Sequence, residues 1–222
     1  MGQKIHPTGF RMGITETWRS RWYAPKRTFG QLLVEDEKIR THIKREYGFA
    51  AISKIEIERT REEVSVIIHS GRPGLLIGRK GSEVDKIREE LEALTGRRIR
   101  LEVKEIAKPE LAAQLVAENV AQQLEKRAAF RRAMKQSVEA TMAAGAKGIK
   151  IRCAGRLGGA EMHRSEVVVR GSVPLTRLSA NIDYGQAMAR CTYGILGVKV
   201  WIYLGVYPPQ VKEKEAPRGD DA

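Results

Sequence analysis

Residues 75–87 combine two glycines and two cations in a pattern that suits binding to a phosphodiester backbone. The segment reads LLIGRKGSEVDKI, an apolar stretch followed by a Gly-Arg-Lys-Gly tetrapeptide and the start of an amphipathic pattern. Because the glycines carry no side chain, a bulky partner can approach the backbone N–H groups closely. Ser82 and Asp85 have the spacing of a capping box, which predicts a helix whose positive dipole end faces the same partner. We therefore predict a nucleic-acid contact at Gly78, Arg79, Lys80 and Gly81.

The tetrapeptide is weak evidence when it is taken alone. A Walker-type phosphate loop fits less well, because it needs four residues between its glycines whereas Gly74 and Gly78 enclose three. An ordinary turn between two helices remains an alternative. Only the copy at Gly78 has two central cations, an apolar lead-in and a helix start. Gly-x-x-Gly also begins at Gly71, Gly145, Gly155 and Gly194.

A second cationic cluster lies in residues 126–138, where no acidic residue occurs. On a helix of 3.6 residues per turn, Arg131, Arg132 and Lys135 fall within an arc of about 100°. Most charge runs are simply solvated faces. Here no cation of the cluster has a carboxylate four residues away within it, so the repulsion between the cations is uncompensated. This favours a binding site for a polyanion. Further cations that could contact phosphates are Lys126, Arg127, Lys147, Lys150, Arg152, Arg156 and Arg164.

The composition favours a polyanionic partner and offers little for catalysis. The formal net charge is +13, from 40 Lys and Arg against 27 Asp and Glu. A protein this basic usually binds a polyanion, and nucleic acid is the first candidate for that partner. No apolar run reaches transmembrane length, and the N-terminus has no signal-peptide core. Cys153 and Cys191 are far apart and the four histidines are scattered, which gives no metal site. We predict a cytoplasmic protein with no cofactor, no membrane partner and no small-molecule substrate.

The first thirty residues differ from the rest of the chain. Their aromatic residues, Trp18, Trp22 and Tyr23, could stack on bases or pack onto the domain behind them. Because the segment is rich in Gly and Arg and poor in aliphatic residues, we expect it to become ordered only against a partner. Glu16 is its only acidic residue. Five of its cations are candidate RNA contacts: Arg11, Arg19, Arg21, Lys26 and Arg27.

Hydrophobic periodicity predicts a compact two-layer α+β module in the first half of the chain. Gly48 and Gly96 follow two of its predicted helices as C-caps. Residues 61–63 form the turn between its first two strands. In chain order we expect a helix over 29–47, strands over 52–60 and 64–69, a short helix over 72–77, a helix over 82–94 and a strand over 99–103.

The second half begins near Pro109 and predicts helices followed by strands. Residues 110–144 contain no Gly or Pro, so they form two helices or one long helix, and no residue locates a break. Strands are expected over 149–153, 165–170, 182–193 and 198–206, with glycine-containing turns that include Gly197. The domains are then a basic arm at 1–37, an α+β domain at 38–106, a second at 107–207 and a disordered tail at 208–222.

Several segments together resemble the bacterial-type ribosomal protein S-three family of the small subunit. They are Gly2 to Arg11, Ile77 to Gly81, Lys108 to Leu111, Phe130 to Lys135, Gly145 to Gly148, Gly155 to Glu161, Val173 to Leu175 and Tyr193 to Lys199. The similarity extends from residue 2 to about residue 207. The chain departs from this family's pattern at Met162-His163 and at 166–169, where a Trp-containing segment is expected.

The resemblance implies a type II KH domain followed by a domain of two helices on a four-stranded, mostly antiparallel sheet. It implies a place in the head of the small ribosomal subunit, bound to 16S-type ribosomal RNA beside other head proteins. The family also lines the channel through which messenger RNA enters, and its helix-unwinding cations correspond to Arg131, Arg132 and Lys135. A free-standing KH-type RNA regulator or chaperone is the alternative. A nuclease or lyase would need a metal cluster or an activated lysine, and the sequence has no carboxylate-histidine constellation.

Overall fold

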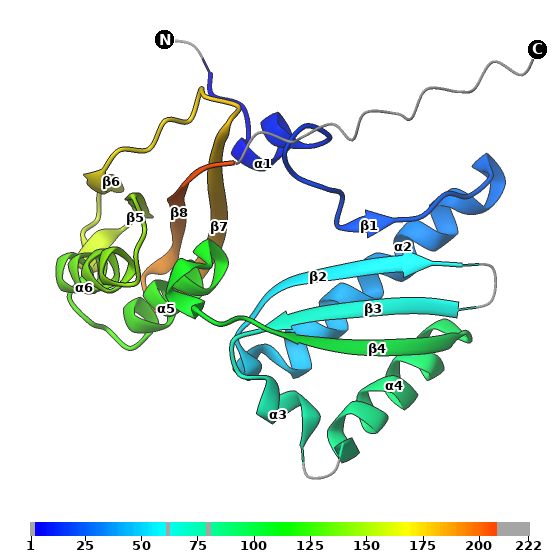
Figure 1. The fold of residues 1–222 in the computed structure, drawn as a ribbon. Coiled ribbons are helices and arrows are strands. Elements are labelled where there is room, and N and C mark those ends of the chain that lie inside the picture. Colours follow the sequence, from blue (N-terminus) through cyan, green and yellow to red (C-terminus); the bar gives the residue numbers. More distant parts are fainter. Residues whose placement is uncertain (1–2, 61–62, 79–80, 208–222) are drawn as a thin grey trace, which may run out of the picture.

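Two four-stranded sheets, each covered by helices on one face, form two α+β domains (Figure 1). The computed structural model describes residues 3–60, 63–78 and 81–207. The predicted fold class, a type II KH domain followed by a two-helix, four-stranded domain, is confirmed. The predicted tail at 208–222 lies outside the described residues.

The first domain packs its helices against one face of a sheet with the order β1-β2-β3-β4. β3 pairs antiparallel with β2 and parallel with β4. Its core includes Ile39, Ile57, Ile68 and Leu91, which alternate along the strands or recur at helical spacing. The elements are β1 (Ser20–Arg21), α2 (Lys26–Glu46), β2 (Ile52–Arg59), β3 (Glu63–Ser70), α3 (Pro73–Ile77), α4 (Ser82–Thr95) and β4 (Arg98–Glu105).

The start of α4 differs from the prediction. The N-cap of this helix is Gly81, with φ of 87°, and no side chain caps the helix. The predicted capping box is therefore wrong, because Ser82 is already the first helical residue. The reversal from α3 into α4 needs a left-handed backbone at the cap, and glycine adopts that conformation without steric cost.

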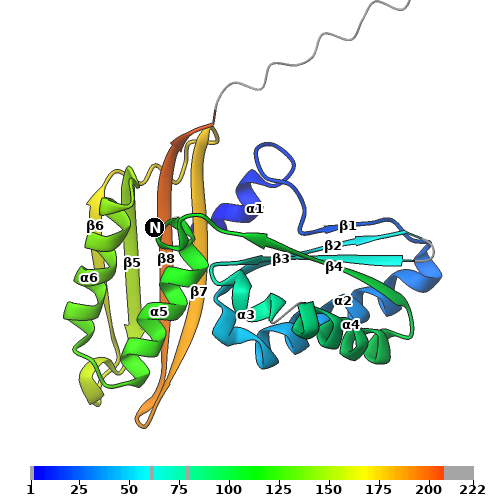
Figure 2. The same cartoon turned by 60° about the horizontal axis from the view of Figure 1, so that its bottom comes forward.

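The second domain places α5 and α6 on one face of an antiparallel sheet with the order β6-β5-β8-β7 (Figure 2). Its core is formed by Val120 and Met134 of the helices against Ile149, Ile151 and Val200 of the sheet. The elements are α5 (Ala113–Glu125), α6 (Phe130–Ala143), β5 (Gly148–Gly155), β6 (Arg164–Gly171), β7 (Ala180–Cys191) and β8 (Gly194–Val206).

The break between α5 and α6 occurs at a residue that is not glycine. Arg127 has φ of 61°, and its N–H donates to the Leu124 carbonyl at 3.0 Å while the Ala128 N–H donates to the Gln123 carbonyl at 3.0 Å. This hydrogen-bond pattern is a Schellman closure, which usually has glycine at the left-handed position. The sequence could not locate the break because the usual marker is missing.

The turn between β7 and β8 is also shifted from its predicted place. Cys191 pairs with Gly194, so the turn consists of Thr192 and Tyr193. Gly197, which we expected in the turn, lies inside β8 and pairs with Ala154 of β5. The hairpin loop between β7 and β8 is two residues long, which is shorter than the loop that the position of Gly197 predicted.

The N-terminal segment is ordered within the chain, so the expectation that it orders only against a partner is wrong. The helix α1 (Pro7–Arg11) packs on β7, whereas β1 adds a parallel strand to β2 of the first domain (Figure 1). Arg11 is completely buried and its guanidinium donates to the carbonyls of Pro7, Leu175, Arg177 and Ala180 at 2.9–3.1 Å. One short segment thus attaches to both domains.

Candidate nucleic-acid interface

The three cations at 131, 132 and 135 share the exposed side of α6. This helix buries its opposite side through residues that include Met134 and Val138, which pack into the core of the second domain. The helical period therefore directs the cations away from the sheet. All three side chains are exposed: Arg131, Arg132 and Lys135, together called the α6 stripe below.

One member of the α6 stripe has an acidic partner that lies far away in the sequence. The guanidinium of Arg131 lies 3.2 Å from a carboxylate oxygen of Glu166 on β6, and Arg164 lies 3.8 Å from the same oxygen. Both guanidiniums also lie 5.6–5.7 Å from the centroid of the Phe130 ring. The α6 stripe is therefore partly compensated, although no carboxylate pairs with Arg132 or Lys135 among the described residues.

Replacing Glu166 by glutamine should strengthen RNA binding about threefold, because Arg131 and Arg164 lose a competing anion at an exposed site. The stability should change by less than about 1 kcal/mol, since exposed ion pairs contribute little. Fluorescence anisotropy with a labelled single-stranded RNA measures the affinity. The matched control is Glu105→Gln, which removes an equal charge from the end of β4. Equal affinities of the two variants would contradict the competition.

The Gly-x-x-Gly turn joins α3 to α4. Gly78 has φ of 67° and ψ of −170°, and a Cβ built on it would lie 2.6 Å from Cγ of Glu83. Gly81 has φ of 87°, but nothing lies within 4 Å of its Cβ position. Leu75 and Ile77, which precede the turn, are exposed although the sequence presents them as part of an apolar stretch. Arg79 and Lys80, the two predicted central cations, lie outside the described residues.

The two glycines of the turn should respond differently to alanine. Gly78→Ala should lower the free energy of unfolding by about 2–3 kcal/mol, because both the backbone conformation and the Glu83 contact disfavour a Cβ. Gly81→Ala should cost about 1 kcal/mol, since only its left-handed φ is strained. Urea unfolding of the two variants measures the difference. Equal losses would show that the Glu83 contact has no effect.

Two predicted RNA contacts of the N-terminal segment are engaged inside the protein. Arg11 cannot reach RNA, because it is buried and hydrogen-bonded to four carbonyls. Arg21 pairs with Glu56 and Glu58 of β2. The indole N–H of Trp22 donates to Asp36 at 2.8 Å, so this ring packs onto the first domain. The Arg21 side chain nevertheless stays 41% exposed. The other predicted contacts of this segment are also exposed: Arg19, Lys26 and Arg27.

The remaining predicted cations surround the second domain. Arg156 donates to the carbonyls of Ala160 and Tyr193, which holds it against the Tyr193 ring. The Lys150 ammonium lies 5.3 Å from the centroid of Trp201. Exposed side chains without an ion-pair partner among the described residues are Lys126, Arg127, Lys147 and Arg152.

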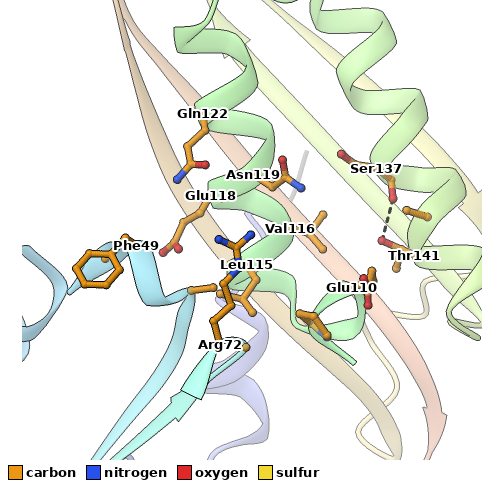
Figure 3. A pocket seen from close by; sticks show the side chains of 15 residues that line it. Phe49, Arg72, Glu110, Leu115, Val116, Glu118, Asn119, Gln122, Ser137 and Thr141 are labelled. Carbon is orange, nitrogen blue, oxygen red and sulfur yellow. Dashed lines mark hydrogen bonds between the residues drawn. The ribbon is translucent and has the colours of Figure 1, made fainter. Parts of the chain in front are cut away.

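A cavity of about 470 Å³ lies where the two domains meet (Figure 3). Its lining includes Arg72, Glu110 and Glu118, and the Gln114 amide donates to Glu118 at 2.7 Å. Burial raises the pKa of the Glu118 carboxyl. Among the described residues that line the cavity none is His, Cys or Lys.

The described residues offer little for redox or metal chemistry. Burial raises the pKa of the Cys153 thiol to about 11, which keeps it protonated and unreactive at neutral pH. Within the described ranges, no group of three or more His, Cys, Asp or Glu side chains could hold a metal ion. No helix in this part of the chain is long and apolar enough to cross a membrane.

Comparisons with known proteins agree with the fold. A family model for the KH domain matches residues 38–111, and one for the C-terminal domain of ribosomal protein S3 matches residues 120–202. Small ribosomal subunit protein uS3 of Desulforamulus reducens is 52% identical over 221 residues, covering 100% of both chains. The uS3 protein of Pelotomaculum thermopropionicum is 55% identical, covering 99% of this chain and 96% of the relative.

The predicted family resemblance is thus confirmed over the full length of the chain. The uS3 protein of Caldicellulosiruptor saccharolyticus is 54% identical over 222 residues and again covers 100% of both chains. Both the KH fold and the second domain of the structure coincide with the matched segments. The chain therefore belongs to the uS3 family of small ribosomal subunit proteins.

Proposed function

We propose that this protein is a structural component of the small ribosomal subunit, which binds ribosomal RNA and guides messenger RNA without catalysing a reaction. The observation that carries the guidance role is the α6 stripe, which points three cations away from the core on one exposed helical face. The Gly-x-x-Gly turn at Gly78 and Gly81 is a second proposed RNA contact. Its backbone is open at Gly81, where a ligand can approach closely.

The proposed mechanism is electrostatic. Cations that neutralise phosphates release condensed counterions, and this binding does not depend on base identity. A stripe of cations on a rigid helix holds a single strand along its backbone. Base-paired messenger RNA that reaches the stripe is then opened, because the separated strand is stabilised by its phosphate contacts.

Co-sedimentation with small ribosomal subunits at high salt tests the proposed assembly. We expect the protein to remain with the subunit, because a resident component buries its contacts, whereas a weakly bound factor dissociates as salt screens its charges. A free-standing KH-type regulator or chaperone would appear in the supernatant. Release of the protein at moderate salt would therefore favour that alternative and contradict the proposal.

A further inference from the structure

The sheet of the second domain has one face that the helices do not cover. In β5, Ile149, Ile151 and Cys153 point toward α5 and α6. Because side chains alternate along a strand, Lys150 and Arg152 point to the opposite face. The same alternation places a set of β8 residues on this outer face: Gly197, Lys199 and Trp201.

The outer face has cations but no acids on its strands. Arg152 and Lys199 lie directly opposite each other on adjacent strands, and Lys150 lies opposite Trp201. Like charges directly opposite each other in a sheet are destabilising. The two acidic residues of the four strands point the other way: Asp183 accepts from the Ala113 N–H of α5, and Glu166 pairs with Arg131 of α6. The repulsion on the outer face is therefore uncompensated by the sheet itself.

Aromatic rings lie beside these cations. Tyr184 of β7 pairs with Trp201, and their ring centroids are 5.5 Å apart. The His6 ring meets Tyr184 edge-on at 4.6 Å. Burial and the nearby charges of Arg19 and Lys199 lower the pKa of His6, which keeps this imidazole neutral beside the cations. A row of rings thus crosses the sheet next to the row of cations.

The outer face is divided into a closed part and an open part. Ile182 and Tyr203 are buried in a small cluster, and Arg11 holds the backbone of the segment that includes Leu175. The partly buried Trp201 packs against this cluster, so its ring lies at the border between the two parts. Further along the strands the face is open, and side chains such as Val167, Val169 and Met188 are 47–62% exposed. The cations at 150, 152 and 199 lie in this open part.

We infer that the open sheet face, centred on Arg152, Lys199 and Trp201, is a further binding site for single-stranded RNA. The cations hold phosphates, and the rings and exposed aliphatic side chains contact unpaired bases. The inference rests on the proposed RNA-binding function and adds a surface on the opposite side of the sheet from the α6 stripe. An acidic protein segment would match the charge, but the partly exposed rings of Tyr184 and Trp201 favour RNA, because unpaired bases stack on such rings.

Fluorescence anisotropy of the full chain with a fluorescein-labelled oligouridylate tests this site. The variant Arg152→Gln with Lys199→Gln should bind about tenfold more weakly, and its slope of log affinity against log salt should fall by about 1.4, or 0.7 for each phosphate that the protein no longer neutralises. The matched control, Lys38→Gln with Arg45→Gln on α2, removes equal charge at exposed positions of the first domain and should bind within about twofold of the unchanged protein. Thermal unfolding checks that both variants fold.

A reference variant separates this inference from the proposed function. Arg132→Gln with Lys135→Gln removes two cations of the α6 stripe. If that variant weakens binding while the sheet variant binds like the unchanged protein, the sheet site is refuted and the α6 stripe stands. If the sheet variant alone weakens binding, the sheet site stands and RNA binding by the stripe is refuted. Absence of any binding by the unchanged protein would overturn both.

Photo-crosslinking identifies the occupant. An oligonucleotide that contains 4-thiouridine should crosslink to the peptides of Trp201 or Tyr184, and the double variant of the sheet face should lose these crosslinks. Polyglutamate serves as the competing probe for an acidic protein segment. Equal competition by polyglutamate without crosslinks to either aromatic residue would assign the face to protein and overturn the inference.

Discussion

Replacing Arg131, Arg132 and Lys135 by alanine will slow translation through a stable messenger RNA hairpin about tenfold, equivalent to about 1.4 kcal/mol in the barrier. Translation of an unstructured message will proceed at the unchanged rate. The reason is that the α6 stripe stabilises the separated strand through phosphate contacts, which matters only where strands must separate. Reconstituted translation with paired messages, identical except for the hairpin, measures the ratio of the two rates.

Charge-preserving variants provide the control for this result. Arg132→Lys and Lys135→Arg keep a cation at each position, so they should retain most of the hairpin rate, because phosphates are bound here as point charges. Alanine at Lys38 and Arg45 of α2 removes exposed charge from another face and should have no effect on the ratio. An alanine variant of the α6 stripe that passes hairpins at the normal rate would refute the guidance role.

Replacing Arg11 by methionine will lower the free energy of unfolding by about 3–5 kcal/mol. Methionine fills much of the same space, but it donates no hydrogen bond, so the carbonyls of Leu175, Arg177 and Ala180 lose their partner. Leaving buried polar groups unsatisfied costs about 1–3 kcal/mol each. The N-terminal segment should also detach more readily, because Arg11 makes three of its hydrogen bonds to the second domain.

Urea unfolding and limited proteolysis measure the two effects of this substitution. Trypsin should cut the variant near Arg19 and Arg21 much faster than the unchanged protein, because a detached segment fits a protease readily. Arg19→Met is the control, since Arg19 is exposed and its loss should change stability by less than about 0.5 kcal/mol. If Arg11→Met were as stable as this control, the buried guanidinium would not anchor the segment.

The sequence predicted most elements of the fold because its hydrophobic spacing was regular. Alternating apolar residues located β2 and β3, and Gly96 marked the end of α4 as expected. The errors occurred where backbone conformation decided the outcome. Arg127 adopts a left-handed conformation without being glycine, and Gly81 takes the cap position that the Ser82 pattern suggested for serine.

The candidate site was only partly visible in the sequence for a related reason. Helical spacing is local, so it placed the α6 stripe on one exposed face. Pairing across a sheet is not local, so neither the Glu166 partner of Arg131 nor the opposition of Arg152 and Lys199 could be derived before the strand register was known. The prediction of Arg11 as an RNA contact was wrong for the same reason, since three of its four acceptors are 164–169 residues away.

The attachment of the N-terminal segment has a consequence for how the chain is made. The acceptors of Arg11 at Leu175, Arg177 and Ala180 are synthesised 164–169 residues after it. The first domain can fold while synthesis continues, because domains generally fold as units. Its basic leading segment cannot attach to β7 until residues 175–191 have left the ribosome. Attachment of this segment therefore requires that synthesis has passed Ala180, and products that stop earlier leave a cationic segment open to proteases.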